Sequence, residues 1–174
     1  MCIRDRVERA QTSHLPDPYD PTPIERGIGV YYTDLSWGGI SFAILEDRKF
    51  KSGPDRVLEK ESYENTFEMD IDSATLLGKR QLDFLEDWTT NWKDVEMKAV
   101  LSQTLFANLI THSPTLKQKR RYSVDSNGWP QTGRNKALSI IRKSYACMIA
   151  GDQHLGSVIH HGIEDWNNGP YSFA

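Results

Sequence analysis

The first half of the chain alternates between apolar runs and polar connections. Two apolar runs, at about 29–35 and 40–45, flank a Trp37-Gly38-Gly39 turn, and this spacing predicts a β-hairpin. The Pro-rich segment 15–23 before the hairpin is predicted to be extended, because each proline biases the preceding residue away from the helical region. The polar stretch 46–72 after the hairpin is long for a connection, and loops of that length are usually functional or mobile.

The second half of the chain repeats a helix followed by a strand. Apolar residues recur at helical spacing over 77–92 and over 134–144, so each segment is predicted to be an amphipathic helix, with Thr132 as the expected N-cap of the second. A short apolar run follows each helix, at 97–101 and 146–150, and is predicted to be a buried strand. A hairpin followed by two helix–strand units predicts an α/β layered fold with a parallel or mixed sheet.

Composition and charge narrow the class of protein. A length of 174 residues allows one domain with a substantial core, and 38% hydrophobic and 26% charged residues are ordinary for a globular protein. The formal net charge of −3 argues against a nucleic-acid-binding surface, because neutralising phosphates requires a basic face. No apolar stretch approaches the length of a membrane span. Two cysteines exclude a disulfide framework, and Cys147 is expected to be a structural thiol.

The most informative feature for chemistry is the tetrapeptide at the end of the last predicted strand. Gly151 permits a tight turn, and Asp152 and His154 follow it one residue apart. Ligands bind where the strands of open α/β sheets end, and a carboxylate oxygen and a neutral imidazole nitrogen both suit metal ions of intermediate hardness. Asp152 and His154 are therefore predicted to bind a metal. A complete metal site needs more than two ligands, and the alternative for an isolated D-x-H is a surface turn.

Other polar residues are predicted to reach the same place. The first buried strand ends near Gln103, which shares a crevice with Asp152 if the two strands are neighbours. The loop 125–131 is rich in turn formers, and Asn127 and an exposed Trp129 are candidate ligand contacts, with an ordinary Asx-type turn as the alternative. Arg48 at the end of the hairpin could bind an anion such as phosphate or belong to a solvated charged turn.

The remaining histidines have weaker assignments. His160 and His161 are adjacent on a predicted strand, so they point to opposite faces and at most one can join a site formed by His154. A structural or surface role is predicted for both. His14, in the Pro-rich segment, has no assigned role.

Four segments carry motifs that occur in the same order in one protein family. Residues 42–52 resemble a strand ending in L-D-x-R-x-Y-R, and residues 77–85 resemble an L-G-x-x-Q-x-x-W-L helix. Residues 125–138 resemble D-x-W-x-G-Y-x-x-x-R-x-x-L-L, and residues 151–154 resemble G-D-x-H. In their order and spacing, these segments resemble the alkaline phosphatase D (PhoD-like) family of metallophosphatases over most of the chain.

The resemblance implies part of a calcineurin-like αββα sandwich, truncated at its N-terminus. It implies hydrolysis of phosphate mono- or diesters by a metal-bound hydroxide, with calcium and iron as the suggested metals, other divalent metals as alternatives, and a small phosphorylated substrate. Asp152 and His154 match the family's metal-binding strand end, whereas no catalytic residue is assigned. Asn127-Gly128-Trp129 departs from the family's W-x-G-Y, which puts the substrate preference in doubt, and Glu46-Asp47 departs from its single acid. The candidate substrate-binding residues are Asn127, Trp129, Arg134, Gln103 and Arg48.

The N-terminus predicts that the chain is part of a longer protein. Residues 1–6, Met-Cys-Ile-Arg-Asp-Arg, resemble a translated sequencing adapter, so the natural reading frame is expected to begin upstream. The family's early Asp, Asp–Tyr and Asn–His–Glu motifs would then lie before residue 1. We expect residues 7–174 to be the C-terminal portion of one metallophosphatase-like domain, and to be inactive alone or nearly so. The family implies export to the periplasm or the cell exterior.

A second class of function remains open from the sequence. The alternative is a non-catalytic α/β module that binds anionic or carbohydrate ligands through Trp129 and the Pro-rich segment. Metal content separates the two hypotheses, because only the phosphoesterase requires a bound metal.

Overall fold

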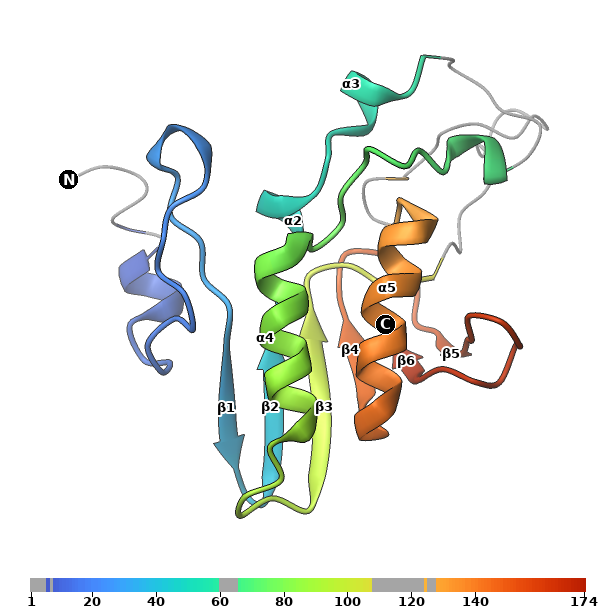
Figure 1. The fold of residues 1–174 in the computed structure, drawn as a ribbon. Helices are drawn as coiled ribbons and strands as arrows, with labels where there is room; N and C mark the ends of the chain where they lie inside the picture. Colours follow the sequence, from blue (N-terminus) through green and yellow to red (C-terminus); the bar gives the residue numbers. More distant parts are fainter. Residues whose placement is uncertain (1–5, 7, 60–65, 108–123, 125–127) are drawn as a thin grey trace.

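The described strands form one six-stranded sheet. The computed structural model describes residues 6, 8–59, 66–107, 124 and 128–174 (Figure 1). The strand order is β1-β2-β3-β4-β6-β5, in which β2, β3, β4 and β6 are parallel and the two edge strands, β1 and β5, are antiparallel to their neighbours. The predicted hairpin and the predicted mixed sheet are therefore confirmed. The strands are β1 Thr33–Trp37, β2 Ile40–Ile44, β3 Met97–Ser102, β4 Cys147–Ala150, β5 Val158–His160 and β6 Tyr171–Phe173.

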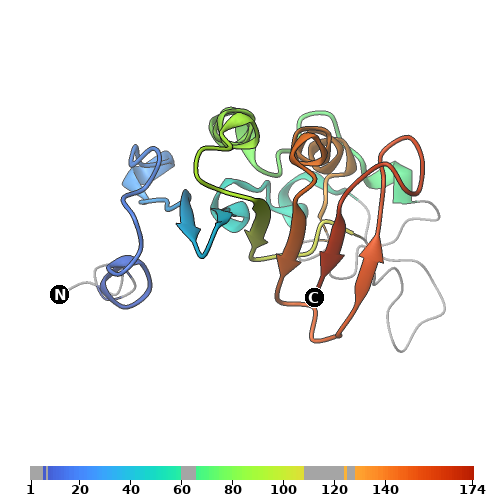
Figure 2. The ribbon, with the colours of Figure 1, turned by 90° about the horizontal axis from the view of Figure 1, so that it is seen from below.

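Two helices cover one face of this sheet. Helix α4 spans Gly78–Thr90 and connects β2 to β3, and helix α5 spans Gln131–Ile141 and connects β3 to β4. Parallel strands require crossover connections of this kind. Seen along the strands, both helices lie on the same side of the sheet (Figure 2). Helix α5 continues into a 3₁₀ turn at Arg142–Ser144, and both helices occur where the sequence predicted them.

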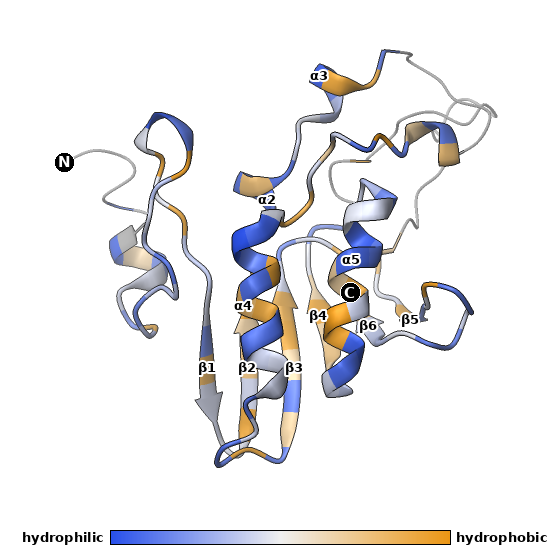
Figure 3. Cartoon of the chain, in the orientation of Figure 1, coloured by the Kyte–Doolittle hydropathy of each residue, from blue (hydrophilic) through white to orange (hydrophobic). Residues whose placement is uncertain are grey.

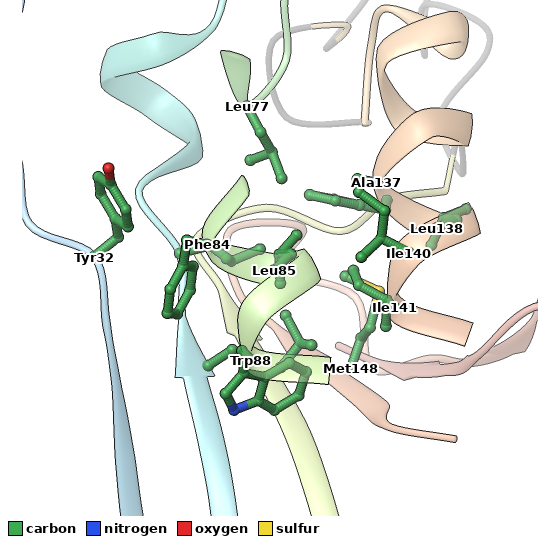
Figure 4. Close-up of a cluster of buried hydrophobic side chains, with 14 of the residues drawn as sticks. Tyr32, Leu77, Phe84, Leu85, Trp88, Ala137, Leu138, Ile140, Ile141 and Met148 are labelled. Atoms are coloured by element: carbon green, nitrogen blue, oxygen red, sulfur yellow. The ribbon is translucent and has the colours of Figure 1, made fainter. Parts of the chain in front are cut away.

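The main core lies between these helices and the sheet. Trp88 lies three and four residues after Leu85 and Phe84 on one side of α4, and all three are at most 4% exposed. Leu138 of α5 and Met148 of β4 are both 0% exposed. Figure 4 shows these side chains meeting between the two helices and the sheet. Burying each large apolar side chain contributes about 1.5–3 kcal/mol, so this interface is the main source of stability in the described chain.

The opposite face of the sheet is apolar and open to solvent. Ile149, Phe173 and Val158 lie in register across β4, β6 and β5, and they are 45%, 40% and 68% exposed. Their sequence neighbours Met148 and Ser172 are 0% exposed, because successive residues of a strand point to opposite faces. Apolar bands also mark β2, β3 and β4 in Figure 3. An αββα sandwich has its second sheet against such a face, so the described chain supplies one sheet and one helical layer.

The long polar stretch contains short helical segments and packs against α5. Trp129 joins a second apolar cluster with residues from this stretch, including Leu58 and Met69. The expected capping of α5 by Thr132 is wrong, because Pro130 occupies the N-cap position and has no side-chain cap bond. Instead, Thr132 donates from its backbone nitrogen and its hydroxyl to the Asp70 carboxylate, at 2.9 and 2.6 Å. The segments are α2 Asp47–Phe50, α3 Pro54–Val57 and a 3₁₀ turn at Thr66–Met69.

The Pro-rich segment forms no helix or strand and is tied to α4. Arg80 Nε donates to Asp20 Oδ2 at 2.6 Å, and Arg80 Nη2 donates to the carbonyl oxygens of Asp20 and Thr22 at 3.2 and 2.7 Å. A π-helical turn at Glu8–Thr12 precedes this segment, and a 3₁₀ turn at Glu25–Gly27 follows it. Within the described ranges, none of the helices has the length and apolar character needed to cross a bilayer.

Candidate active site at the strand ends

Three parallel strands end at the same edge of the sheet. β2 pairs with β3, and β3 pairs with β4, so the segments that follow them lie side by side. Arg48 Nη1, after β2, lies 3.8 Å from Asp152 Oδ2, after β4. The predicted proximity of the ends of β3 and β4 is therefore confirmed. We refer to segments 46–48, 102–104 and 151–154 together as the strand-end cluster.

Gln81 of α4 fixes the first of these three segments. Its side chain is 0% exposed, its Oε1 accepts the backbone N–H of Glu46 at 2.9 Å, and its Nε2 donates to the Glu46 carbonyl at 2.9 Å. The amide therefore extends the hydrogen-bond ladder of the sheet past the end of β2. This contact also satisfies backbone groups that would be costly to bury without partners. Helix α2 begins directly after the clamped residue, and this places Arg48.

Gln103 joins the ends of β2 and β3 through two buried acids. One amide atom of Gln103 lies 3.1 Å from both Glu46 Oε1 and Asp47 Oδ1, and it lies 3.3 Å from the backbone nitrogen of Arg48. Two carboxylate oxygens at the shorter distance outweigh one N–H group, so this atom is the amide nitrogen, which donates to both acids. Gln103, although exposed, thus holds the side chains of the two residues that precede Arg48.

The two acids at the end of β2 are buried, which the sequence interpretation did not predict. Glu46 and Asp47 are 4% and 0% exposed. Burial raises the pKa of Asp47, and a hydrogen bond from the Thr104 hydroxyl acts in the opposite direction. Glu46 accepts the backbone N–H of Lys49 at 3.4 Å and pairs with its Nζ at 3.1 Å. The sequence signal that could have indicated this burial is the pair of adjacent acids, Glu46 and Asp47, directly after the apolar run 40–45.

Asp152 and His154 are exposed and have left-handed backbone conformations. Their φ angles are 72° and 52°. Asp and His adopt such angles more readily than most residues, but each instance still costs on the order of 1 kcal/mol. Backbone strain of this kind clusters at ligand-binding turns. The carboxylate suits a hard cation such as calcium, and the imidazole suits iron, so this donor pair fits the metals that the resemblance implies.

Two ligands are too few for a tightly bound metal ion. In the part of the chain that the structure describes, no group of three or more His, Cys, Asp or Glu side chains could hold one. Asp152 and His154 therefore fit a metal site only as part of a larger ligand set.

The expected exposure of Trp129 is wrong. Trp129 is 5% exposed, and its indole Nε1 donates to the Met69 carbonyl at 2.7 Å, so this side chain supports the second apolar cluster. The turn-rich composition around it suggested an exposed loop, but the distant residues Leu58 and Met69 pack in the same buried cluster. Asn127 lies outside the described residues.

Arg134 lies in the first turn of α5 and is half-buried. Its Nε and Nη2 donate to Asn135 Oδ1 at 3.2 and 3.1 Å. Burial lowers the pKa of Arg134, and the nearby Asp70 raises it. The positive charge of Arg134 helps to lower the pKa of His161, which follows β5. His161 Nε2 lies 2.7 Å from Ser172 Oγ. Arg134 therefore interacts electrostatically with Asp70 and His161.

A hollow of about 650 Å³ borders the strand-end cluster. Its walls come from the N-terminal segment, including Asp17 and Tyr31, and from the ends of β2 and β3. Glu46, Lys49 and Gln103 line it, whereas Arg48, Asp152 and His154 do not. The volume is in the range of small-molecule sites, and the hollow opens next to the residues expected to carry the chemistry.

A family model described as PhoD-like phosphatase matches residues 5–170. The chain belongs to the PhoD-like phosphatase family. This match covers most of the chain and confirms the resemblance inferred from the four motifs. A comparison with the sequences of curated proteins finds no match.

A solved structure titled "Structure of PhoD" has a similar fold. The TM-score is 0.61 with 18% sequence identity, over 98% of this chain and 33% of that chain. At this identity the likeness shows the fold alone, and the α/β prediction is thereby confirmed. This chain spans about a third of the length of that PhoD structure.

Proposed function

We propose that this chain is the part of a metal-dependent phosphoesterase that carries one edge of its active site, and that the whole enzyme hydrolyses phosphate mono- or diesters. The observation that supports this most directly is the strand-end cluster. Asp152 and His154 follow one parallel strand of a PhoD-like fold, and Arg48 lies 3.8 Å from Asp152 after another. The proposed cation-binding residues and the proposed anion-binding arginine would then act side by side, as phosphoryl transfer requires.

Asp152 and His154 are proposed to be metal ligands, with calcium and iron as the metals. Bound metals would supply Lewis-acid activation and neutralise phosphoryl charge. Because no group of three or more candidate ligands occurs among the described residues, the remaining ligands are proposed to come from the rest of the protein. We expect this chain alone to bind metal weakly and to have little or no phosphatase activity.

Arg48 and Gln103 are proposed to position the substrate. The Arg48 guanidinium can donate to a phosphoryl oxygen, and its backbone is held by the contacts of Gln81 and Gln103 to Glu46 and Asp47. A leaving group could occupy the adjacent 650 Å³ hollow. Arg134, the matched arginine of the family's helix start, is proposed to support the start of α5. Export from the cytoplasm is proposed from the family.

The proposal is tested with the 174-residue chain and manganese as a paramagnetic probe. Mn²⁺ should broaden the amide NMR signals of residues 151–155 at millimolar concentration, and Asp152→Asn with His154→Ala should abolish the broadening. Asp165→Asn, an exposed acid in another loop, is the matched control. Broadening that is unchanged in the double variant would remove the proposed ligands. Robust hydrolysis of p-nitrophenyl phosphate by the chain with calcium and iron would contradict the expected inactivity.

The alternative of a non-catalytic binding module loses its original support. It relied on an exposed Trp129 and a free Pro-rich segment, but Trp129 is buried and the Pro-rich segment is tied down by Arg80. The phosphoesterase hypothesis is therefore favoured.

A further inference from the structure

The turn 151–156 after β4 is exposed at every position except one. Gln153 is 8% exposed, whereas Asp152 and His154 on either side of it are exposed, as are the remaining residues of the turn. No role was predicted for Gln153 from the sequence. Buried contacts are what distinguish an ordered turn from a mobile one, so Gln153 is the residue that anchors this turn to the body of the protein.

The sheet fixes where this turn begins. Ala150, the last residue of β4, is in register with Ser102 of β3, and a Cβ atom at Gly151 would lie 3.7 Å from the Gln103 carbonyl oxygen. The backbone therefore still runs beside the end of β3 at Gly151. The Gln153 backbone N–H donates to the Gly151 carbonyl at 3.0 Å, and this bond closes a tight turn centred on the intervening residue.

The turn is strained on both sides of its anchor. Asp152, at the centre of the tight turn, has a φ of 72°, and His154 has a φ of 52°. Turns of this size with a positive φ at the centre are rare, because side chains strain that conformation. Such conformations persist only where the surrounding structure over-determines them. Within the turn, the burial of Gln153 supplies that constraint.

The chemistry of the anchor favours orientation over stability. Burying an amide costs free energy that burying an apolar side chain does not, so a methionine of similar length would hold the turn against the protein at lower cost. A buried amide, however, is held by directional hydrogen bonds, which fix the orientation of a segment as well as its depth. Glutamine at position 153 is therefore better explained by what it does for its two neighbours than by stability.

The two neighbours are the proposed metal ligands. Asp152 and His154 are exposed on either side of the buried anchor, and Asp152 Oδ2 lies 3.8 Å from Arg48 Nη1. Metal affinity rises when ligands are oriented before the ion binds, and residues that orient ligands are worth about 10–100-fold in affinity. We propose, on the basis of the metal site proposed above, that Gln153 is a positioning residue whose buried amide fixes the turn so that Asp152 and His154 present their donors to one ion.

The test uses the 174-residue chain, with Mn²⁺ as the probe and ¹⁵N relaxation as a readout that needs no metal. Gln153→Ala should lower the amide order parameters of Asp152 and His154 from about 0.85 to below about 0.6, and should weaken Mn²⁺ binding about tenfold. Broadening of the His154 imidazole signals should fall relative to that of the Asp152 amide, because the ion is no longer shared. The urea midpoint should stay close to that of the parent chain. Leu155→Ala, at a residue that is 55% exposed in the same turn, is the matched control and should change the affinity less than about twofold.

Three outcomes would overturn the role of Gln153 and leave the metal site standing. The first is that Gln153→Ala keeps the order parameters and the Mn²⁺ affinity of the parent chain. The second is that its affinity falls together with its urea midpoint, which would indicate a general structural role. The third is that Gln153→Met, which keeps the length but lacks the amide, has parent-like order and affinity. Absence of Mn²⁺ broadening at 151–155 in the parent chain is a different result, because it would remove the proposed metal site itself.

Discussion

The two faces of the sheet have similar apolar composition but opposite environments. On one face, Val100 and Met148 are 0% exposed beneath α4 and α5. On the other face, Ile149, Phe173 and Val158 form a continuous apolar row that is 40–68% exposed. A sheet that is packed on one face only normally has polar residues on its solvent face. Apolar residues on both faces therefore indicate a sheet that is packed on both faces in the whole protein.

Only one face of the sheet is fully packed by residues of this chain. The core on the helix-covered face is built entirely from residues of this chain. Its packing can therefore determine the strand order and the position of the strand-end cluster. The open face exposes side chains that form no core within the described residues. This matches a chain that spans about a third of the PhoD structure it resembles.

The largest expected effect comes from placing the same charge on each face in turn. Met148→Asp should destabilise the chain by about 4 kcal/mol or more, because it buries an unpaired carboxylate under α5. Ile149→Asp, at the next residue of the same strand, should cost about 1 kcal/mol or less. Urea unfolding followed by circular dichroism measures both. Equal destabilisation by the two variants would mean that the open face is closed in solution, which sedimentation would reveal as association.

A pH titration compares the adjacent histidines on the two sides of the sheet. His160 stacks on Tyr171, whereas His161 contacts Ser172, which is fully buried on the helix side. Burial, with the charges of Arg134 and His160, lowers the pKa of His161 from 6.5 to about 4. The unfolded chain therefore binds this proton at a higher pH than the folded chain does, so stability falls as pH drops from about 6.5 towards 4.

We expect this histidine to change the stability by on the order of 2 kcal/mol, less than the full shift implies because the ring is partly solvated. His161→Gln should flatten the stability profile between pH 7 and 4. His14→Gln, at an exposed histidine in the Pro-rich segment, is the control and should keep the stability profile of the parent chain. A parent-like slope in His161→Gln would show that other groups carry the acid sensitivity.

Periodicity in the sequence was sufficient to predict the elements that bury one face. The helical spacing of Leu85 and Trp88 predicted α4, and the short run ending at Ala150 predicted β4. Both patterns arise from local packing against a single partner, which the chain itself contains. The D-x-H turn after β4 was found for the same reason, because strand ends gather at one edge of a parallel sheet.

Features that depend on distant partners could not be predicted in this way. Trp129 looked exposed among turn formers, but residues some 60 positions earlier bury it. The buried pair of acids at the end of β2 depends on Gln81 and Gln103, and the roles of those amides become visible only once the helix and the strand are packed. Local sequence carries no record of which segment will cover a given side chain.

A smaller effect tests how the helical layer is attached at its α5 edge. Asp70→Ala removes the carboxylate that accepts from the Thr132 backbone and hydroxyl, so it should destabilise the chain by about 1 kcal/mol, as loss of an N-cap does. Asp72→Ala, two residues along, is the matched control. Thermal unfolding should show a lower midpoint for Asp70→Ala alone. An unchanged midpoint would mean that the apolar cluster around Trp129 holds this end of α5 without the cap.

The smallest net effect is expected at Lys98, the one charged side chain on the helix-covered face of β3. It is 1% exposed, donates to the Trp88 carbonyl near the end of α4, and lies 4.7 and 4.8 Å from the ring centroids of Trp88 and Trp92. Its contact with a carbonyl at the helix C-terminus and two cation–π contacts offset the cost of burying the charge. Replacing such a buried charge by an apolar side chain of similar length is often nearly neutral, so Lys98→Met should change stability by less than about 1.5 kcal/mol at pH 7.

The pH dependence distinguishes this balance from simple packing. Burial lowers the pKa of Lys98, so the folded chain releases this proton at a lower pH than the unfolded chain does. The unfavourable contribution is fully present below the folded pKa and diminishes as the pH rises towards the unfolded value of 10.5. The parent chain should therefore gain stability relative to Lys98→Met as the pH is raised towards 10.5, measured by urea unfolding at each pH. If the difference in stability between the parent chain and Lys98→Met stayed constant with pH, Lys98 would keep its proton over the whole pH range. The helix-covered face would then accommodate a charge as readily as the open face does.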